Sequence, residues 1–238
     1  MAENRVLLVE GKDDLNVLGH IFLNHNIEVD ENGKRLWKVE EENKIGRILI
    51  RDQEGVDKLK KRLDENIFDN LLEDLPVELK GSEVVALGII VDADFDVKAR
   101  WESLANRLKE LKYEDVPDLP KANGTICTGK DLPKIGVWLM PDNTLPGMLE
   151  DLVKLLVPDE QKGLLGKAIE AVESIPKEER LFITENSDKT AKAQIHTYLA
   201  WQSRPGVPYG IAIREKFLKA DSPQTVDLMK WIKELFNL

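Results

Sequence analysis

Acidic residues stand directly after two apolar runs of this chain, at positions where buried β-strands should end. Residues 6–9 are followed by Glu10, and residues 84–91 are followed by Asp92-Ala93-Asp94-Phe95-Asp96. Ligands of α/β sheets usually bind at the carboxyl ends of the strands, so these carboxylates should share one edge of a sheet. Like charges at short range resist joint ionisation, and a divalent cation removes that conflict. Hard oxygen ligands suit Mg²⁺ or Mn²⁺, so the pattern predicts a site for one of these ions.

The rest of the chain alternates between strand-like and helix-like patterns. This alternation predicts an α/β fold with a mainly parallel sheet and helices on both faces. Strands are expected at 5–10, 48–50, 84–91, 124–128 and 136–140, a hairpin turn at Asn32-Gly33, and helices at 13–24, 54–63, 98–111 and 146–156. The pattern of residues 67–81 is ambiguous, although its apolar residues favour a helix. Beyond 158 the pattern is mostly helical, at 159–174, 189–202 and 223–236. We therefore expect a metal-binding domain at residues 1–157 and a helical C-terminal region at residues 158–238, packed on it.

The composition is that of an ordinary folded protein and narrows the classes of function. Of the 238 residues, 42% are hydrophobic and 33% are charged. The apolar runs are far shorter than the roughly 20 residues that a membrane helix needs, so no membrane partner is expected. The N-terminus lacks a signal-peptide pattern, and one cysteine, Cys127, cannot form an internal disulfide. These features predict a cytoplasmic protein.

The charge of the chain is strongly negative but uneven. A formal net charge of −10 argues against a general nucleic-acid coat protein. Residues 187–219, however, hold six basic and two acidic residues, and this segment is the best candidate for a phosphate-facing surface. The alternative is an ordinary solvated helix face. The candidate contacts to phosphate or nucleic acid are Lys12, Lys189, Lys192, His196 and Arg204.

Residues 9–14 (Val-Glu-Gly-Lys-Asp-Asp) and 91–94 (Val-Asp-Ala-Asp) resemble the two signature motifs of the TOPRIM domain. That domain occurs in topoisomerases, bacterial primases and the overcoming-lysogenization-defect (OLD) nucleases. Further stretches, residues 136–143 followed by 147–151 and residues 191–202, resemble a small prokaryotic family of stand-alone TOPRIM-like proteins. The resemblance implies a TOPRIM-like fold in which Glu10 binds metal or acts as an acid/base group. It also implies that Asp92 and Asp94 hold Mg²⁺.

A third acidic group follows the strand expected at residues 136–140. The resemblance to OLD-type nucleases implies that Asp142 or Glu150 completes a second metal site, and two cations would stabilise the attacking and leaving oxygens together. For each residue taken singly, the alternative is a solvated helix start. Lys192 and His196 are four residues apart and share a helix face. Lys192 is a candidate catalytic group because a cation there can stabilise charge on phosphate; a helical histidine is more often structural or exposed.

Other motifs fit the sequence less well. An EF-hand loop needs a glycine and a glutamate that the string after Asp92 lacks. Haloacid-dehalogenase phosphatases carry threonine or valine where Asp96 stands. Residues 124–131 nearly spell a P-loop, but Asp131 replaces the hydroxyl residue that binds Mg²⁺. The chain is also too short for a topoisomerase, and one cysteine cannot build the zinc module of a primase.

These observations together predict phosphodiester chemistry on nucleic acid that depends on Mg²⁺ or Mn²⁺, with a nuclease acting on DNA or RNA as the leading hypothesis. In one alternative, the chain is an effector subunit that works only with an ATPase partner protein, as in OLD-like phage defence. In the other, it is a non-catalytic protein that binds metal or phosphate.

Overall fold

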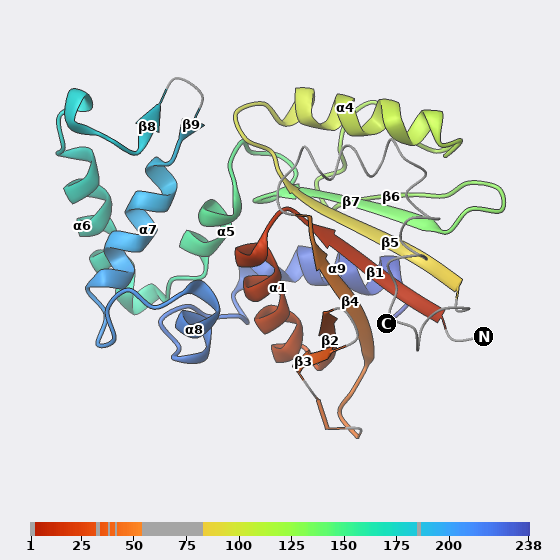
Figure 1. Ribbon diagram of the computed structural model, residues 1–238, viewed down its shortest axis with the longest axis horizontal. Helices are drawn as coiled ribbons and strands as arrows, with labels where there is room; N and C mark the ends of the chain where they lie inside the picture. Colours follow the sequence, from red (N-terminus) through yellow and green to blue (C-terminus); the bar gives the residue numbers. More distant parts are fainter. Residues whose placement is uncertain (1–2, 32–33, 38, 41, 54–82, 185–186) are drawn as a thin grey trace.

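In the described part of the chain, seven strands form one sheet in the order β3-β2-β4-β1-β5-β7-β6 (Figure 1). The computed structural model describes residues 3–31, 34–37, 39–40, 42–53, 83–184 and 187–238. The strands are β1 (Glu3–Val9), β2 (Ile27–Glu31), β3 (Lys34–Trp37), β4 (Gly46–Asp52), β5 (Glu83–Asp92), β6 (Thr125–Cys127) and β7 (Lys134–Met140). The five inner strands are parallel, and the edge strands β3 and β6 are antiparallel to their neighbours. The predicted mainly parallel α/β sheet is confirmed.

Between β1 and β5 the order of the strands reverses. From β1 the chain passes through α1 (Lys12–Asn24) to β2, on the β4 side of the sheet. From β5 it passes through α4 (Val97–Glu110) to β6 and β7 on the other side. Val9 pairs with Ile90, so Glu10 and Asp92 leave the sheet at the same edge. A reversal of this kind opens a crevice in which α/β proteins bind ligands.

The two faces of the sheet bury separate hydrophobic layers. Leu7 and Val9 face one layer, whereas Val6 and Leu8 face the other, as the two-residue period of a strand requires. The first layer contains α1 and α9 (Val226–Phe236), and the second contains α4 through Trp101 (Figure 1). Helices therefore cover both faces, as the sequence predicts.

Helix α9 approaches the sheet closely because two strand positions carry glycine. A Cβ atom on Gly136 would lie 2.6 Å from the side chain of Leu235, and one on Gly88 would lie 3.2 Å from the same side chain. Any larger residue at Gly136 would force the side chains of Leu235 and Trp231 on α9 to shift. The helical C-terminal region thus includes a helix that packs directly on the sheet.

The remaining elements lie mainly beside the sheet (Figure 1). They are α5 (Leu149–Leu155), η2 (Asp159–Gln161), α6 (Lys162–Glu173), η3 (Lys177–Glu179), β8 (Ile183–Thr184), β9 (Ser187–Asp188), α7 (Thr190–Ala200), α8 (Tyr209–Arg214) and η4 (Pro223–Thr225). Helices α6 and α7 pack on each other, and α8 packs on α1. Sequence patterns predict α6, α7 and α9 but miss α8 and the short β8–β9 hairpin.

Some expectations concern residues that the structure does not describe. The helices expected at 54–63 and 67–81, and the turn at Asn32-Gly33, lie outside the described residues. The strands on either side of that turn do pair in an antiparallel manner. The division at residue 157 stays a prediction. Among the described helices, none combines the length and the apolar character needed to cross a membrane.

Candidate metal centre

An open cleft of about 380 Å³ lies at the carboxyl ends of β1 and β5. Four chain segments form it: the β1–α1 junction, the end of β5, the start of α5 and the first half of α7. Its lining residues are Glu10, Gly11, Lys12, Asp13, Asp14, Asp92, Leu149, Glu150 and Lys192. The cleft thus brings together acidic residues that are far apart in the sequence.

A chain of hydrogen bonds orients the two carboxylates that end the central strands. The backbone N–H of Asp92 donates to Oε1 of Glu10 over 2.9 Å. The backbone N–H of Leu149, the first residue of α5, donates to Oδ1 of Asp92, also over 2.9 Å. These bonds tie β1, β5 and α5 together at the cleft. Both carboxylates are consequently held by backbone groups.

Asp14 is the third carboxylate, one helical turn beyond Glu10. Its Oδ2 accepts a hydrogen bond of 3.0 Å from the backbone N–H of Gly11, and the residue is only 7% exposed. Burial, followed by the negative charge of Glu10, raises the pKa of Asp14 to about 7. Asp14 is therefore only partly ionised at neutral pH unless positive charge is supplied.

The pKa of Asp92 is raised further than that of Asp14. Burial is the main cause, and the charges of Asp14, Glu10 and Glu150 add to it, so that the pKa of Asp92 rises to about 9. The hydrogen bond from Leu149 opposes this rise without cancelling it. The cleft thus places carboxylates so close together that Asp14 and Asp92 are not both ionised at neutral pH.

Glu150 is the fourth carboxylate and links the cleft to the C-terminal helices. It is 4% exposed, and its Oε1 accepts hydrogen bonds from Nζ of Lys192 at 3.0 Å and from the hydroxyl of Tyr209 at 3.3 Å. The same hydroxyl lies 3.2 Å from Nε2 of His196, whose ring stacks on that of Tyr209. Burial and the charge of Glu150 raise the pKa of Tyr209, so its hydroxyl stays protonated.

Lys192 provides positive charge at the wall of the cleft. Partial burial lowers its pKa, but the hydrogen bond to Glu150 and the charges of Glu150, Asp13 and Asp92 outweigh burial and raise the pKa above its usual value. Its Nζ also lies 4.0 Å from Asp13. Lys192 is therefore a fixed cation at neutral pH.

Two predicted metal ligands do not line the cleft. Asp94 forms an ion pair with Arg100, and its backbone exchanges hydrogen bonds of 2.9 and 2.7 Å with Gly147. Asp142 accepts three hydrogen bonds of 2.9 Å, two from Thr144 and one from Leu145, which fix a tight turn. Both carboxylates thus have local structural partners, and their role as ligands stays a prediction.

Only some of the predicted phosphate-binding residues lie at the cleft. Lys12 and Lys192 line the cleft, and His196 reaches it through Tyr209. Lys189 is exposed next to the first turn of α7, and Arg204 pairs with Glu215 at 3.1 Å. Residues 187–219 therefore do not present one continuous basic surface to the cleft.

Sequence patterns missed several contributors to the cleft, among them Asp13, Asp14 and Tyr209. Asp14 carried a usable signal, because a spacing of four residues at a strand-to-helix junction places it one turn beyond Glu10. Tyr209 carried none, since it belongs to the short helix α8, whose six residues show too little periodicity to be recognised.

The oxygen donors of the cleft suit Mg²⁺ or Mn²⁺ chemically. In the described part of the chain, no three carboxylate, imidazole or thiol groups are close enough together to hold one ion as they stand. Bringing the carboxylates onto one ion would therefore need side-chain movement, against the hydrogen bonds that hold Glu10 and Glu150. The donor types fit such an ion, whereas their spacing as it stands does not.

The fold and cleft define an α/β protein with a carboxylate-rich crevice at the reversal of its strand order. The chain belongs to the family described as protein of unknown function DUF3226, whose model matches residues 4–237. Comparison with curated proteins and with solved structures gives no significant match.

Proposed function

We propose that this protein hydrolyses phosphodiester bonds of nucleic acid with the help of Mg²⁺ or Mn²⁺. One observation carries the proposal: Glu10, Asp14, Asp92 and Glu150 converge on one open cleft beside the cation of Lys192. The resemblance of residues 9–14 and 91–94 to the TOPRIM motifs supports the same chemistry. A cleft of this charge would repel phosphate unless a metal ion were bound, so activity should depend strictly on the metal.

The carboxylates at the strand ends are the residues that would hold the ion. Asp92 and Glu10 are oriented by backbone hydrogen bonds, and Asp14 and Glu150 flank them. A divalent cation bound there would neutralise this cluster and act as a Lewis acid toward a phosphate oxygen. Because backbone groups fix Asp92, little reorganisation of that residue would be needed during the reaction.

Lys192 and Glu10 have the catalytic roles in this proposal. Lys192 stays protonated and lies at the cleft wall, where it can donate a hydrogen bond to a non-bridging phosphate oxygen and stabilise its charge. Glu10 can accept the proton of the attacking water. Lys12, exposed at the rim, offers a second contact to the nucleic-acid backbone.

The pairing of the basic residues favours a version that requires a partner. Arg204 and Arg214 pair with Glu215, and Lys219 pairs with Glu160, so these cations are already partly neutralised. A protein with a net charge of −10 then gains little from electrostatic attraction to nucleic acid. In this version a partner protein, an ATPase according to the OLD resemblance, supplies the grip on the strand.

The test is cleavage of mixed DNA and RNA substrates with Mg²⁺ or Mn²⁺, with and without EDTA. Asp92→Asn is the informative variant, because the amide keeps the shape and the acceptor for Leu149 but cannot ionise to hold a metal ion. Asp118→Asn is the matched control: its carboxylate is fully exposed and belongs to a loop outside the cleft. We expect metal-dependent cleavage by the wild type and by Asp118→Asn, and none by Asp92→Asn.

Calorimetric titration with Mn²⁺ separates the remaining outcomes. Cleavage that persists in Asp92→Asn would overturn the proposed site. Absence of cleavage together with Mn²⁺ binding that depends on Asp92 would favour the partner-dependent or the non-catalytic protein. Absence of both would reject the metal centre altogether.

A further inference from the structure

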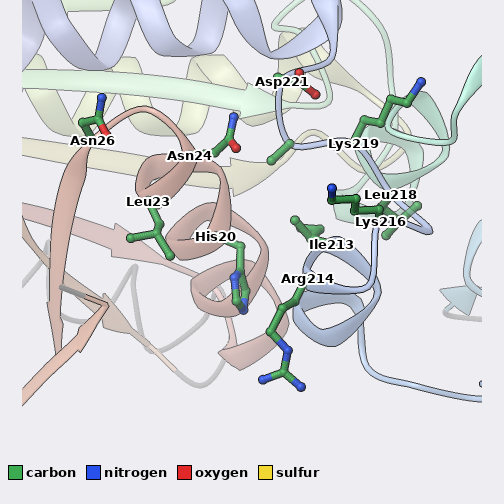
Figure 2. Close-up of a pocket in the computed structure, with 11 residues that line it drawn as sticks. His20, Leu23, Asn24, Asn26, Ile213, Arg214, Lys216, Leu218, Lys219 and Asp221 are labelled. Carbon is green, nitrogen blue, oxygen red and sulfur yellow. The ribbon is translucent and has the colours of Figure 1, made fainter. Parts of the chain in front are cut away.

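A second hollow, of about 790 Å³, lies at the opposite end of α1 from the acidic cleft (Figure 2). One wall is the second half of α1 and the turn after it, and the other is the end of α8 with the segment that follows. The lining residues are His20, Leu23, Asn24, Asn26, Ile213, Arg214, Lys216, Leu218, Lys219, Ala220 and Asp221. Its volume falls within the range of about 300–1,000 Å³ that is usual for small-molecule sites.

The charged groups of this hollow are mostly basic, in contrast to the whole protein. Arg214, Lys216 and Lys219 line it together with a single carboxylate, Asp221. Within the described residues, no carboxylate lies at ion-pair distance from Lys216, whereas Arg214 and Lys219 pair with residues outside the hollow. Figure 2 shows the ammonium of Lys216 directed from the α8 side toward α1. The hollow thus offers a cation whose charge is not already balanced.

The backbone holds the basic segment in place before any ligand binds. Lys216 adopts a left-handed conformation (φ 63°) in the turn that ends α8, and its N–H donates to the carbonyl of Ile213 over 3.0 Å. The N–H of Lys219 donates to the carbonyl of Leu156 over 2.7 Å, which anchors the segment to the end of α5. A preformed site loses little conformational entropy when it binds a ligand.

The hollow also contains apolar side chains and hydrogen-bond acceptors. Leu23 supplies apolar surface, and Ile213 and Leu218, which are almost fully buried, also line the hollow. The amides of Asn24 and Asn26 and the carboxylate of Asp221 lie along the edge nearer the C-terminal end of α1 (Figure 2), and all three can accept hydrogen bonds. The hollow therefore combines a cation, an apolar floor and a row of acceptors.

We infer that this hollow binds a nucleotide-sized phosphate ester, with the phosphate on Lys216 and the sugar hydroxyls or base amino groups on the asparagine side. A nucleoside monophosphate carries these three kinds of group within one molecule of matching size. A nucleic-acid strand fits less well, because its successive phosphates need several unpaired cations and the hollow offers only Lys216 among the residues described. This site is distinct from the acidic cleft and does not depend on the proposed function.

The environment of His20 supplies an independent readout. Burial, and after it the positive charge of Arg214, lowers the pKa of His20 in the free protein. A bound phosphate dianion places negative charge in the same hollow and should raise that pKa. The chain has three histidines, so the His20 signal can be assigned by comparison with a His20→Gln variant.

The experiment is calorimetric titration of the full chain with AMP, GMP, CMP and UMP in EDTA, with adenosine and inorganic phosphate as comparisons. EDTA removes divalent metal, so the acidic cleft cannot contribute. Lys216→Asn is the test variant, because asparagine tolerates the left-handed conformation and the fold is retained. Lys109→Gln on α4, on the other face of the sheet, is the matched control.

We expect at least one monophosphate to bind more tightly than adenosine or phosphate alone. Lys216→Asn should weaken that binding roughly tenfold or more, the effect of losing one charge-assisted hydrogen bond, while Lys109→Gln and Asp92→Asn leave it unchanged. The His20 signal should titrate at higher pH in the complex. Absence of monophosphate binding, equal binding of adenosine, unchanged binding by Lys216→Asn, or binding of oligonucleotides alone would each overturn the inference.

Discussion

The two ends of helix α1 carry sites of opposite charge, and the two sites are built differently. At the N-terminal end, Asp14 and Glu150 are 7% and 4% exposed. At the C-terminal end, Arg214 ends α8, and Lys216 and Lys219 lie in the segment that follows; all three are exposed. Burial and crowding shift the pKa values of Asp14 and Asp92 strongly. The exposed cations are hydrated, and two of them have carboxylate partners.

This difference shows which site depends on a ligand for its charge balance. The macrodipole of α1 favours negative charge at its first turn, yet its contribution is small beside the repulsion of four buried or half-buried carboxylates. Lys192 compensates only part of that charge. A bound cation would allow the acidic cleft to ionise fully, whereas the proposed anion site in the basic hollow does not need its ligand for charge balance.

The largest expected effect is a separation of the two sites by single substitutions. Asp92→Asn should weaken Mn²⁺ binding on the order of a hundredfold or more, because it removes a charged ligand, and should leave monophosphate binding intact. Lys216→Asn should do the reverse. Calorimetric titration of each variant with Mn²⁺, and with a monophosphate in EDTA, measures both effects. If either substitution weakened both ligands, the sites would be coupled and the comparison would fail.

Tyr209→Phe tests whether the acidic cleft extends to the C-terminal helices. The change removes the hydroxyl that contacts Glu150 and His196, so Glu150 loses one of its two orienting partners. We expect cleavage or Mn²⁺ affinity to fall roughly tenfold and the free energy of unfolding to fall by about 1–3 kcal/mol. Thermal unfolding and Mn²⁺ titration measure these effects.

Tyr198→Phe is the matched control for this prediction. Tyr198 is fully buried, and its hydroxyl bonds Gln161 and the carbonyl of Phe217, outside the cleft. The Tyr198→Phe variant should lose about as much stability as Tyr209→Phe but keep the Mn²⁺ affinity of the wild type. If Tyr209→Phe and Tyr198→Phe bound Mn²⁺ with equal affinity, the role of Tyr209 would be structural only.

The carboxylates at the N-terminal end of α1 should make the stability of the protein depend on pH. The pKa of Asp92 is about 9 in the folded protein against an ordinary value of 3.8, so between these values the folded state binds more protons than the unfolded state. In EDTA, stability should therefore fall as pH rises from about 4 to 9, with the contribution of Asp14 ending near its pKa of about 7.

Thermal unfolding in EDTA across this pH range measures the effect. Asp92→Asn should flatten the curve, and saturating Mn²⁺ should counter the fall, because the metal favours the ionised carboxylates. A curve that is as steep in Asp92→Asn as in the wild type would show that groups other than Asp92 cause the fall in stability.

Local sequence patterns recovered the sheet and half of the acidic cleft. Apolar runs that end in acidic residues were enough to place Glu10 and Asp92 at one sheet edge, because strand ends are fixed by register. The packing of α8 on α1, which creates the basic hollow and brings Tyr209 to Glu150, depends on contacts between residues that are distant in sequence. Periodicity within one element contains no information about such contacts.

The same limit explains the different positions of Asp92 and Asp94. The two residues are identical in type and two positions apart, and the sequence motif treats them alike. In the structure, Asp92 follows the strand direction into the cleft, whereas Asp94 adopts a left-handed conformation (φ 53°) and pairs with Arg100. The backbone turn after β5 is what directs Asp94 toward Arg100 and away from the cleft.

Asp94→Asn should accordingly give the smallest effect. The structure predicts that its charge serves the ion pair with Arg100, whose side chain is 11% exposed, so the loss should lower stability but change Mn²⁺ affinity by at most about fivefold. The TOPRIM resemblance predicts instead a loss as large as that of Asp92→Asn. Mn²⁺ titration of the two variants side by side decides between these predictions. A large loss in Asp94→Asn would mean that the loop after β5 rearranges when the ion binds, because the carboxylate must leave Arg100 to reach the cleft.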